Sequence, residues 1–195
     1  MMLSKLLSFI FLVAHTTFVT PDPPAKTVTL KTASPNDEGS DYLPWLMSRK
    51  LTWDDFRCEP QRNMDAVALT STSLGISYRV VNGRLSYEVS CHFSKTRSWG
   101  ILKTPYILAH EQGHFDITEI FARKLHQQLQ AYKYNKRTFR KDITKIYNQV
   151  VKEKEAFQES YDEETSHSRN KRVQKEWLNR IEEMLEQSDR FADYP

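Results

Sequence analysis

Apolar and polar residues alternate over 74–93, on either side of Asn82 and Gly83. Alternation with a period of two predicts half-buried strands, and an Asn-Gly pair favours the two-residue type I′ turn of a β-hairpin. Pairing across this turn gives the hairpin one apolar face, so we expect Cys91 to point to the core and His92 to the opposite face. The expected register pairs Val80 with Leu85, Tyr78 with Tyr87, and Ile76 with Val89.

Helical periodicity follows the hairpin. Thr104 is a favourable N-cap residue and is followed by proline, which suits the first position of a helix, so a first helix is expected over about 105–134. Apolar stripes predict two further helices, at about 138–160 and 170–190. The segment 161–169 lacks such a stripe, so we expect it to be a loop.

These elements predict an α+β fold. A small antiparallel sheet containing the β-hairpin packs on the first helix, and the two C-terminal helices complete the core. A short strand is expected at 51–53, before a turn at Asp54 and Asp55. The chain has 195 residues, of which 39% are hydrophobic, so it is long enough for one domain, which we place at 41–195.

The first forty residues differ in composition from the rest. A short basic segment precedes an apolar run at 6–14, which is too short for a bilayer because a membrane-spanning helix needs about 20 residues. This arrangement is typical of a signal peptide, placed at 1–20, and residues 21–40 are rich in Pro, Thr, Lys and Ser, as in a flexible linker. We therefore expect a secreted or periplasmic protein with no stable membrane insertion after signal cleavage.

Charge and cysteine content restrict the partners only slightly. The 28 Lys and Arg residues nearly balance 25 Asp and Glu residues, and no basic block interleaved with aromatic residues indicates nucleic-acid binding. We therefore expect no nucleic-acid partner. Cys58 and Cys91 are the two cysteines; in an oxidising compartment they form either a disulfide or two unpaired small residues, and both alternatives stay open.

His110, Glu111 and His114 form an HExxH motif inside the first expected helix. Side chains four residues apart project from one helix face, so both imidazoles can bind the same Zn²⁺ ion. The apolar residues of this helix share that face, so we expect the imidazoles to point inward. Glu111 projects about 100° away from His110, which suits a general base acting on metal-activated water.

A catalytic zinc ion normally has three protein ligands, so one more must come from outside the motif. Asp116 and Glu119 lie on the same helix but point away from the two histidines. We favour His167, because the loop at 161–169 can bend back over the first helix. The other candidates are His92, Glu153, Glu155, Glu159, Asp162, Glu163 and Glu164.

Three residues near the motif have alternative roles. Asp116 is either an acceptor for the second N–H of a ligating imidazole or an ordinary surface charge. Tyr161 is either the donor that stabilises a catalytic oxyanion or a tyrosine packed beside Phe157. Gly113 costs up to about 1 kcal/mol relative to alanine inside a helix, so it predicts the close approach of a neighbouring element.

The stretch 110–117, with the sequence HEQGHFDI, resembles a bacterial family of unknown function whose members are described as secreted zinc-dependent proteases. The family pattern usually has glycine after its last histidine, where this chain has Ser168. The resemblance covers about residues 50–178 and implies a zincin-like domain, zinc binding, secretion and peptidase activity. The other segments that carry it are LTWDDF at 51–56, Ser98 with Trp99, and 161–167.

These expectations combine into the hypothesis of a secreted zinc metallopeptidase. One Zn²⁺ ion would be bound by His110, His114 and His167, while Glu111 and Tyr161 would act as catalytic residues on a peptide or protein substrate. One alternative is a non-catalytic exported domain that binds metal or interacts with the cell envelope. Another is a zinc amide or ester hydrolase with a non-protein substrate. A purely structural zinc site would need a fourth protein ligand.

Overall fold

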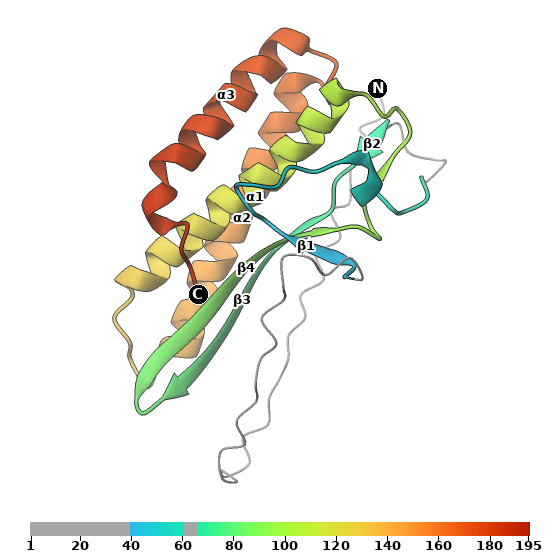
Figure 1. The fold of residues 1–195 in the computed structure, drawn as a ribbon. Helices are drawn as coiled ribbons and strands as arrows, with labels where there is room; N and C mark the ends of the chain where they lie inside the picture. The colour runs from blue at the N-terminus through green and yellow to red at the C-terminus, as the bar shows by residue number, and fades with distance from the viewer. Residues whose placement is uncertain (1–39, 61–65) are drawn as a thin grey trace, which may run out of the picture. The chain divides into compact units, whose positions relative to one another are not determined.

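The structure is a computed structural model of the chain, and it describes residues 40–60 and 66–195 (Figure 1). The chain divides into two units, Met1–Asp37 and Glu38–Pro195, and the described residues all belong to the second. The expected signal peptide at 1–20 lies outside the described residues, as does all of the expected linker except residue 40. Within the described ranges, no helix is both long and apolar enough to span a membrane.

The predicted hairpin is confirmed. Strands β3 (Thr72–Val81) and β4 (Arg84–Ser94) pair antiparallel in the expected register, with Val80 opposite Leu85 and the other two pairs also in place. Asn82 and Gly83 have φ values of 50° and 73°, the left-handed conformation that both central residues of a type I′ turn require.

Two further pairings complete the β-structure. Strand β1 (Tyr42–Pro44) pairs with the other edge of β4, so the sheet has the order β1-β4-β3 and β3 is an edge strand. Strands β2 (Ala68–Leu69) and β5 (Trp99–Gly100) form a separate two-stranded sheet beside it. This small sheet precedes the first helix in the chain.

The prediction of a strand at 51–53 is wrong. Residues Trp53–Asp55 form one turn of 3₁₀ helix instead. The carboxylate of Asp55 accepts a hydrogen bond from the backbone N–H of Thr52 at 2.8 Å, and it also accepts one from Arg49 at 2.7 Å. These local bonds offer the backbone a partner other than a sheet, which is why the chain turns here.

Three helices pack against one another and cover one face of the sheet (Figure 1). They are α1 (Pro105–Ala131), α2 (Phe139–Thr165) and α3 (Lys171–Gln187), and α1 lies directly against β3 and β4. The expected α+β architecture is therefore confirmed. The core between the layers contains, among other side chains, Phe93, Phe115, Ile117, Leu125, Ile143, Val150 and Ile181.

Helix α2 extends about five residues further than its sequence predicts, to Thr165. The side chains of Tyr161 and Thr165 are fully buried, and the Thr165 hydroxyl donates to the carbonyl oxygen of Tyr161 at 2.6 Å. Tertiary packing thus continues the helix through a polar segment. As a result, Asp162 lies in the last two turns of α2 instead of in a loop.

The two cysteines are free. Cys91 belongs to β4 and is buried in the core, at 3% exposure, as the hairpin pattern predicts. Cys58 is half-buried beside the 3₁₀ turn. Of the two alternatives for these residues, the structure has the unpaired one.

Candidate metal centre

The HExxH motif occupies the second and third turns of α1. The start of this helix is fixed by Thr104, whose hydroxyl accepts a hydrogen bond from the backbone N–H of Ile107 at 3.2 Å. His110 and Glu111 are buried, and the rings of His110 and His114 lie edge to face with centroids 4.9 Å apart. The helix therefore presents both imidazoles at one place, below the surface of the domain.

The carboxylate of Asp162, from α2, stands between these imidazoles. Its Oδ1 atom lies 3.1 Å from Nε2 of His110 and 3.1 Å from Nε2 of His114. The three atoms form a group that could hold a metal ion, all within 4.8 Å of one another. The two His–Asp separations are close to the roughly 3.3 Å between ligands that lie about 2.0–2.1 Å from a tetrahedral metal ion such as zinc.

The same proximity creates a strong electrostatic coupling. Burial would lower the pKa of His114, but the negative charges of Asp162 and Glu111 and the hydrogen bond to Asp162 raise it to about 9. Burial would raise the pKa of Asp162, but the two imidazoles hold it far below its usual range. Without a metal ion, a protonated His114 thus compensates the buried carboxylate charge.

Gln158 orients His114. Its side-chain oxygen accepts a hydrogen bond from Nδ1 of His114, and its amide nitrogen donates to the carbonyl oxygen of the same histidine at 3.0 Å. The amide is thereby fixed in one orientation. Because Nδ1 is occupied as a donor, Nε2 of His114 is the nitrogen available to a metal ion, as in histidine ligands held by a second residue.

Glu111 lies next to the metal-binding group but is not part of it. Burial raises the pKa of its carboxyl group, while the charge of His114 and the hydroxyl of Thr70 act in the opposite direction. Thr70 belongs to the connection between β2 and β3, so this connection borders the site. The carboxylate is therefore positioned between α1 and the start of the edge strand.

His167, the expected third ligand, lies beside the group rather than within it. Its Nδ1 atom is 3.7 Å from Oδ1 of Asp162, and its side chain is 55% exposed. It follows directly after α2, where Ser166, His167 and Ser168 have φ values of 51°, 51° and 66°. Three consecutive non-glycine residues in the left-handed region are strained, and such strain persists only where the surrounding structure imposes it.

Tyr161 has a packing position rather than that of an oxyanion donor. Its hydroxyl donates to the carbonyl oxygen of His110 at 3.2 Å, and its ring stacks on the His110 imidazole with centroids 4.5 Å apart. The residue is fully buried, and burial raises the pKa of its hydroxyl well above the usual value. The close approach that Gly113 predicts is the contact with this tyrosine: a Cβ atom at Gly113 would lie 2.5 Å from its hydroxyl oxygen.

Asp116 has neither of the two roles considered for it, because it is buried and its partners lie outside the site. Its carboxylate accepts hydrogen bonds from Trp45 at 2.7 Å and from Lys50 at 3.2 Å, and it does not contact a site histidine. Gln112 completes this arrangement, since its side-chain oxygen accepts from the backbone N–H of Leu51 at 2.7 Å. The two residues therefore attach the segment before the 3₁₀ turn to the back of α1.

Sequence reasoning missed Asp162 as the third donor and Gln158 as the residue that orients His114. Asp162 was one of several remaining acidic candidates, whereas Gln158 gave no signal by itself. Both lie on one face of α2, four residues apart, with Thr165 three residues further on. Extending the stripe of the second helix past residue 160 would have placed this polar face against the HExxH helix.

The family of this chain is shown by its sequence. Residues 25–168 match the family model described as "Bacterial protein of unknown function (DUF922)". The match includes the HExxH helix, Gln158, Asp162 and His167. No curated protein and no solved structure matches the chain. The chain therefore belongs to the DUF922 family.

Proposed function

We propose that this DUF922 protein is an exported zinc-dependent peptidase. One observation carries the proposal: two imidazole nitrogens of an HExxH helix and one carboxylate oxygen of α2 lie at 3.1 Å from each other in the pairs His110–Asp162 and His114–Asp162. Two histidines and one carboxylate are a ligand set of catalytic zinc sites, which leave a further position for water or substrate. Export is part of the proposal because of the expected signal peptide at 1–20.

A zinc ion at this position would supply Lewis acidity, which polarises a peptide carbonyl and makes water a stronger nucleophile at neutral pH. The protein itself would place a general base, Glu111, beside the metal-binding group. Glu111 follows His110 directly on α1, and its carboxylate takes the proton of the attacking water and delivers it to the leaving amine. Its burial keeps bulk water from competing for this carboxylate.

The sheet provides a place for an extended substrate. Strand β3 is an edge strand, and its first residue, Thr72, contacts Thr118 of α1 with hydroxyl oxygens 2.7 Å apart. Thr118 in turn donates to the carbonyl oxygen of His114 at 3.0 Å, so the start of β3 lies about one helical turn from the site. A peptide that adds beside the first residues of β3 would bring its backbone past Glu111, whereas further along the strand the hydroxyl of Tyr147 in α2 already bonds the carbonyl oxygen of Leu74 at 2.8 Å.

His167 supports a second candidate function. A structural zinc site needs four protein ligands, and an exposed imidazole 3.7 Å from Asp162 is close enough to become the fourth after a small movement of its side chain. In that case the domain binds metal without hydrolysing anything, as in the non-catalytic alternative. The two functions differ in the role of Glu111: hydrolysis requires its carboxylate as a base, whereas a structural zinc site does not.

The experiment measures zinc content and hydrolysis in the same preparations. We expect one zinc ion per chain and cleavage of a mixed peptide library by the unmodified protein. Glu111→Gln should keep the zinc and lose at least about 100-fold in rate, because only the base is removed. Asp162→Asn should lose zinc affinity, whereas Glu163→Gln, its exposed neighbour on α2, should retain both properties.

The outcomes separate the candidates. Stoichiometric zinc without hydrolysis of peptides, amides or esters would overturn the enzymatic proposal and leave the structural site. Hydrolysis of esters or non-peptide amides alone, sensitive to Glu111→Gln, would retain the mechanism and replace the substrate class. Equal hydrolysis by the unmodified protein and the Glu111→Gln variant would contradict the mechanism itself.

A further inference from the structure

Basic side chains gather where the tip of the β3–β4 hairpin meets the start of α2. They come from two parts of the chain, 79–84 and 133–145, so neither segment alone forms a long basic block. We call this group the basic surface; all its members are exposed. It consists of Arg79, Arg84, Lys133, Lys136, Arg137, Arg140, Lys141 and Lys145.

An aromatic contact holds the two segments together. The ring of Phe139, the first residue of α2, lies edge to face against Tyr78 of β3, with centroids 6.1 Å apart. Tyr134 packs on the same ring at 5.4 Å, and the guanidinium of Arg140 covers it at 5.4 Å. Figure 1 accordingly shows the hairpin tip and the α1–α2 connection at the same end of the sheet.

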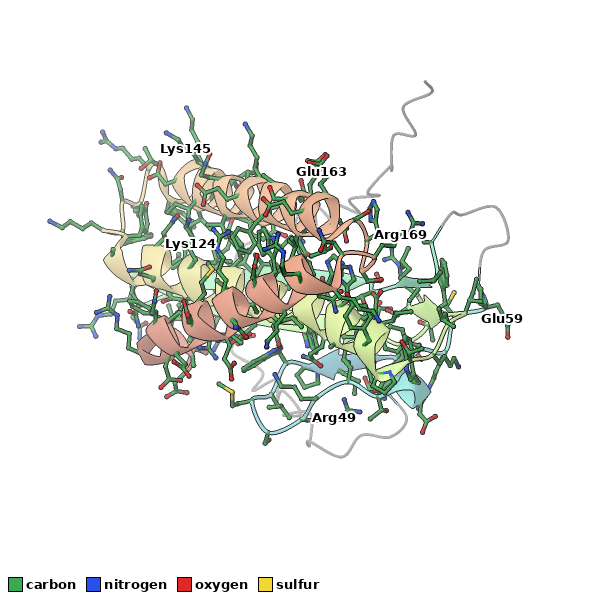
Figure 2. All side chains as sticks on the ribbon, turned by 90° about the horizontal axis from the view of Figure 1, so that it is seen from above. Arg49, Glu59, Lys124, Lys145, Glu163 and Arg169 are labelled. Atoms are coloured by element: carbon green, nitrogen blue, oxygen red, sulfur yellow. The ribbon has the colours of Figure 1, made fainter. Side chains whose placement is uncertain are left out.

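Few acidic groups oppose this charge. Asp142 lies within the basic surface and offsets part of its charge: hydrogen bonds from the hydroxyls of Thr138 and Tyr132, at 2.6 and 2.8 Å, and the charges of Lys141 and Lys145 lower the pKa of its carboxyl group. Glu88 lies within the hairpin, in β4, and its carboxylate accepts a hydrogen bond from the hydroxyl of Ser77 at 3.3 Å. None of the eight basic residues forms an ion pair with a carboxylate of the described residues. Figure 2 shows Lys145 extending into solvent from α2.

Two exposed apolar side chains lie next to residues of the basic surface. Val80 and Val81, at the hairpin tip, are 39% and 49% exposed, and they are flanked by Arg79 and Arg84. Val80 lies at the end of the apolar face of the hairpin, opposite Leu85, and Val81 points to the other face of the strand. Their exposed surface would gain free energy where the tip enters an apolar phase.

We propose that the basic surface binds an anionic lipid bilayer, with the valine tip entering the boundary between headgroups and acyl chains. Each basic residue near an anionic membrane raises the binding constant about fivefold, and exposed aliphatic residues add to this through apolar burial. A nucleic acid would leave the valines without a partner. Its bases would find no free aromatic platform, because Tyr134 and Phe139 pack on each other.

The orientation that follows keeps the metal centre accessible. Lys141 lies in the first turn of α2 and Asp162 lies near its end, so about 30 Å of helix separates the basic surface from the metal-binding group. A protein bound through the hairpin tip would therefore hold the site away from the lipid. This inference does not depend on the proposed hydrolysis.

Co-sedimentation of the full chain with vesicles tests the proposal. We expect binding to vesicles with about 30% anionic lipid, little binding to zwitterionic vesicles, and a steep loss with rising salt. All variants keep residues 1–39, so any contribution of the apolar run at 6–14 is the same in each. Unchanged thermal unfolding would show that the variants fold.

The charge variant is Lys141→Glu with Lys145→Glu, and its matched control is Lys103→Glu with Lys175→Glu, which has the same net charge. The first pair should lower the binding constant at least about 50-fold, and the control less than about fivefold. Val80→Ser with Val81→Ser should lower it about tenfold. An equal loss in the charge variant and its control would overturn the proposal, as would tighter binding to duplex DNA that the valine variant leaves unchanged.

Discussion

The hydroxyl of Tyr161 donates a hydrogen bond to the carbonyl oxygen of His110 across the contact between α2 and α1, over 3.2 Å. The next residue of α2 is Asp162, so this contact sets the distance between the carboxylate and the two imidazoles. Gly113 makes it possible, because the tyrosine ring occupies the space that a side chain at this position would need. A change in the packing distance between α1 and α2 would therefore also change the distances between the three donor atoms.

Gly113→Ala should separate the two helices. Alanine has a better helix propensity by up to about 1 kcal/mol, but its methyl group would lie 2.5 Å from the Tyr161 hydroxyl oxygen, and overpacking costs about 1–3 kcal/mol. We expect a net loss in the free energy of unfolding and at least about tenfold weaker zinc binding. Chemical denaturation and a competitive chelator measure the two effects.

Tyr161→Phe in the Gly113→Ala background serves as the control, because it removes the atom nearest to the new methyl group. Part of the zinc affinity should return in the double variant. Full affinity in Gly113→Ala alone would contradict the dependence of the site on this contact.

Ser168→Gly should stabilise the protein by about 0.5–1 kcal/mol. Ser168 has a φ of 66°, a conformation that costs about 1–2 kcal/mol for a residue with a Cβ atom and nothing for glycine, which in turn loses more backbone entropy on folding. The matched control is Ser160→Gly, inside α2, which should destabilise by about 0.5 kcal/mol. A destabilised Ser168→Gly variant would show that the side chain, and not the backbone, governs this turn.

The stability of the metal-free protein should depend on the pH through His114. Its pKa is raised from 6.5 to about 9, so the stabilisation by Asp162 is fully present below about pH 6.5 and is lost as the pH rises through about 9. The change corresponds to roughly 3 kcal/mol. Denaturation between pH 6 and 10 with a chelator present measures it, and Asp162→Asn should remove most of the slope.

Zinc binding should release a proton near pH 7, because His114 must lose its proton to become a ligand. Calorimetry in buffers of different ionisation enthalpy gives the number of protons released. A value near zero at pH 7 would mean that His114 is already neutral in the metal-free protein.

Asp116 and Gln158 should differ in their effects on metal binding. Gln158→Ala removes the acceptor of the His114 N–H, and losses of this kind lower metal affinity about 10- to 100-fold. Asp116→Asn should keep zinc affinity within about threefold but loosen the segment around Trp45, which hydrogen exchange would detect as faster exchange. Weakened zinc binding in Asp116→Asn would restore the metal-site role that the sequence suggested.

The parts of the fold that were predictable depend on local signals. Asn82 and Gly83 fix the hairpin and its register, and Thr104 with Pro105 fixes the start of α1. These residues act on the backbone next to them, so a pattern along the chain contains the information. The same holds for the two histidines and Glu111, whose spacing is set by one helix.

The end of α2 was not predictable in this way. Tyr161 and Thr165 are helical because they are buried against α1 and α3, and their own segment is polar. Asp162 therefore has its position from tertiary contacts. A loop at 161–169 would favour His167 as the ligand, but the helix continues to Thr165. The basic surface was missed for a similar reason, since its two segments meet only through Phe139.

The donors come from two distant parts of the sequence: Asp162 follows His114 by 48 residues and belongs to another helix. In a chain that has not folded, the carboxylate of Asp162 is not held beside the two motif histidines. On the proposed function, a newly made polypeptide cannot yet hydrolyse other proteins. The site becomes complete only when α1 and α2 pack together. Folding would then control when the site can act.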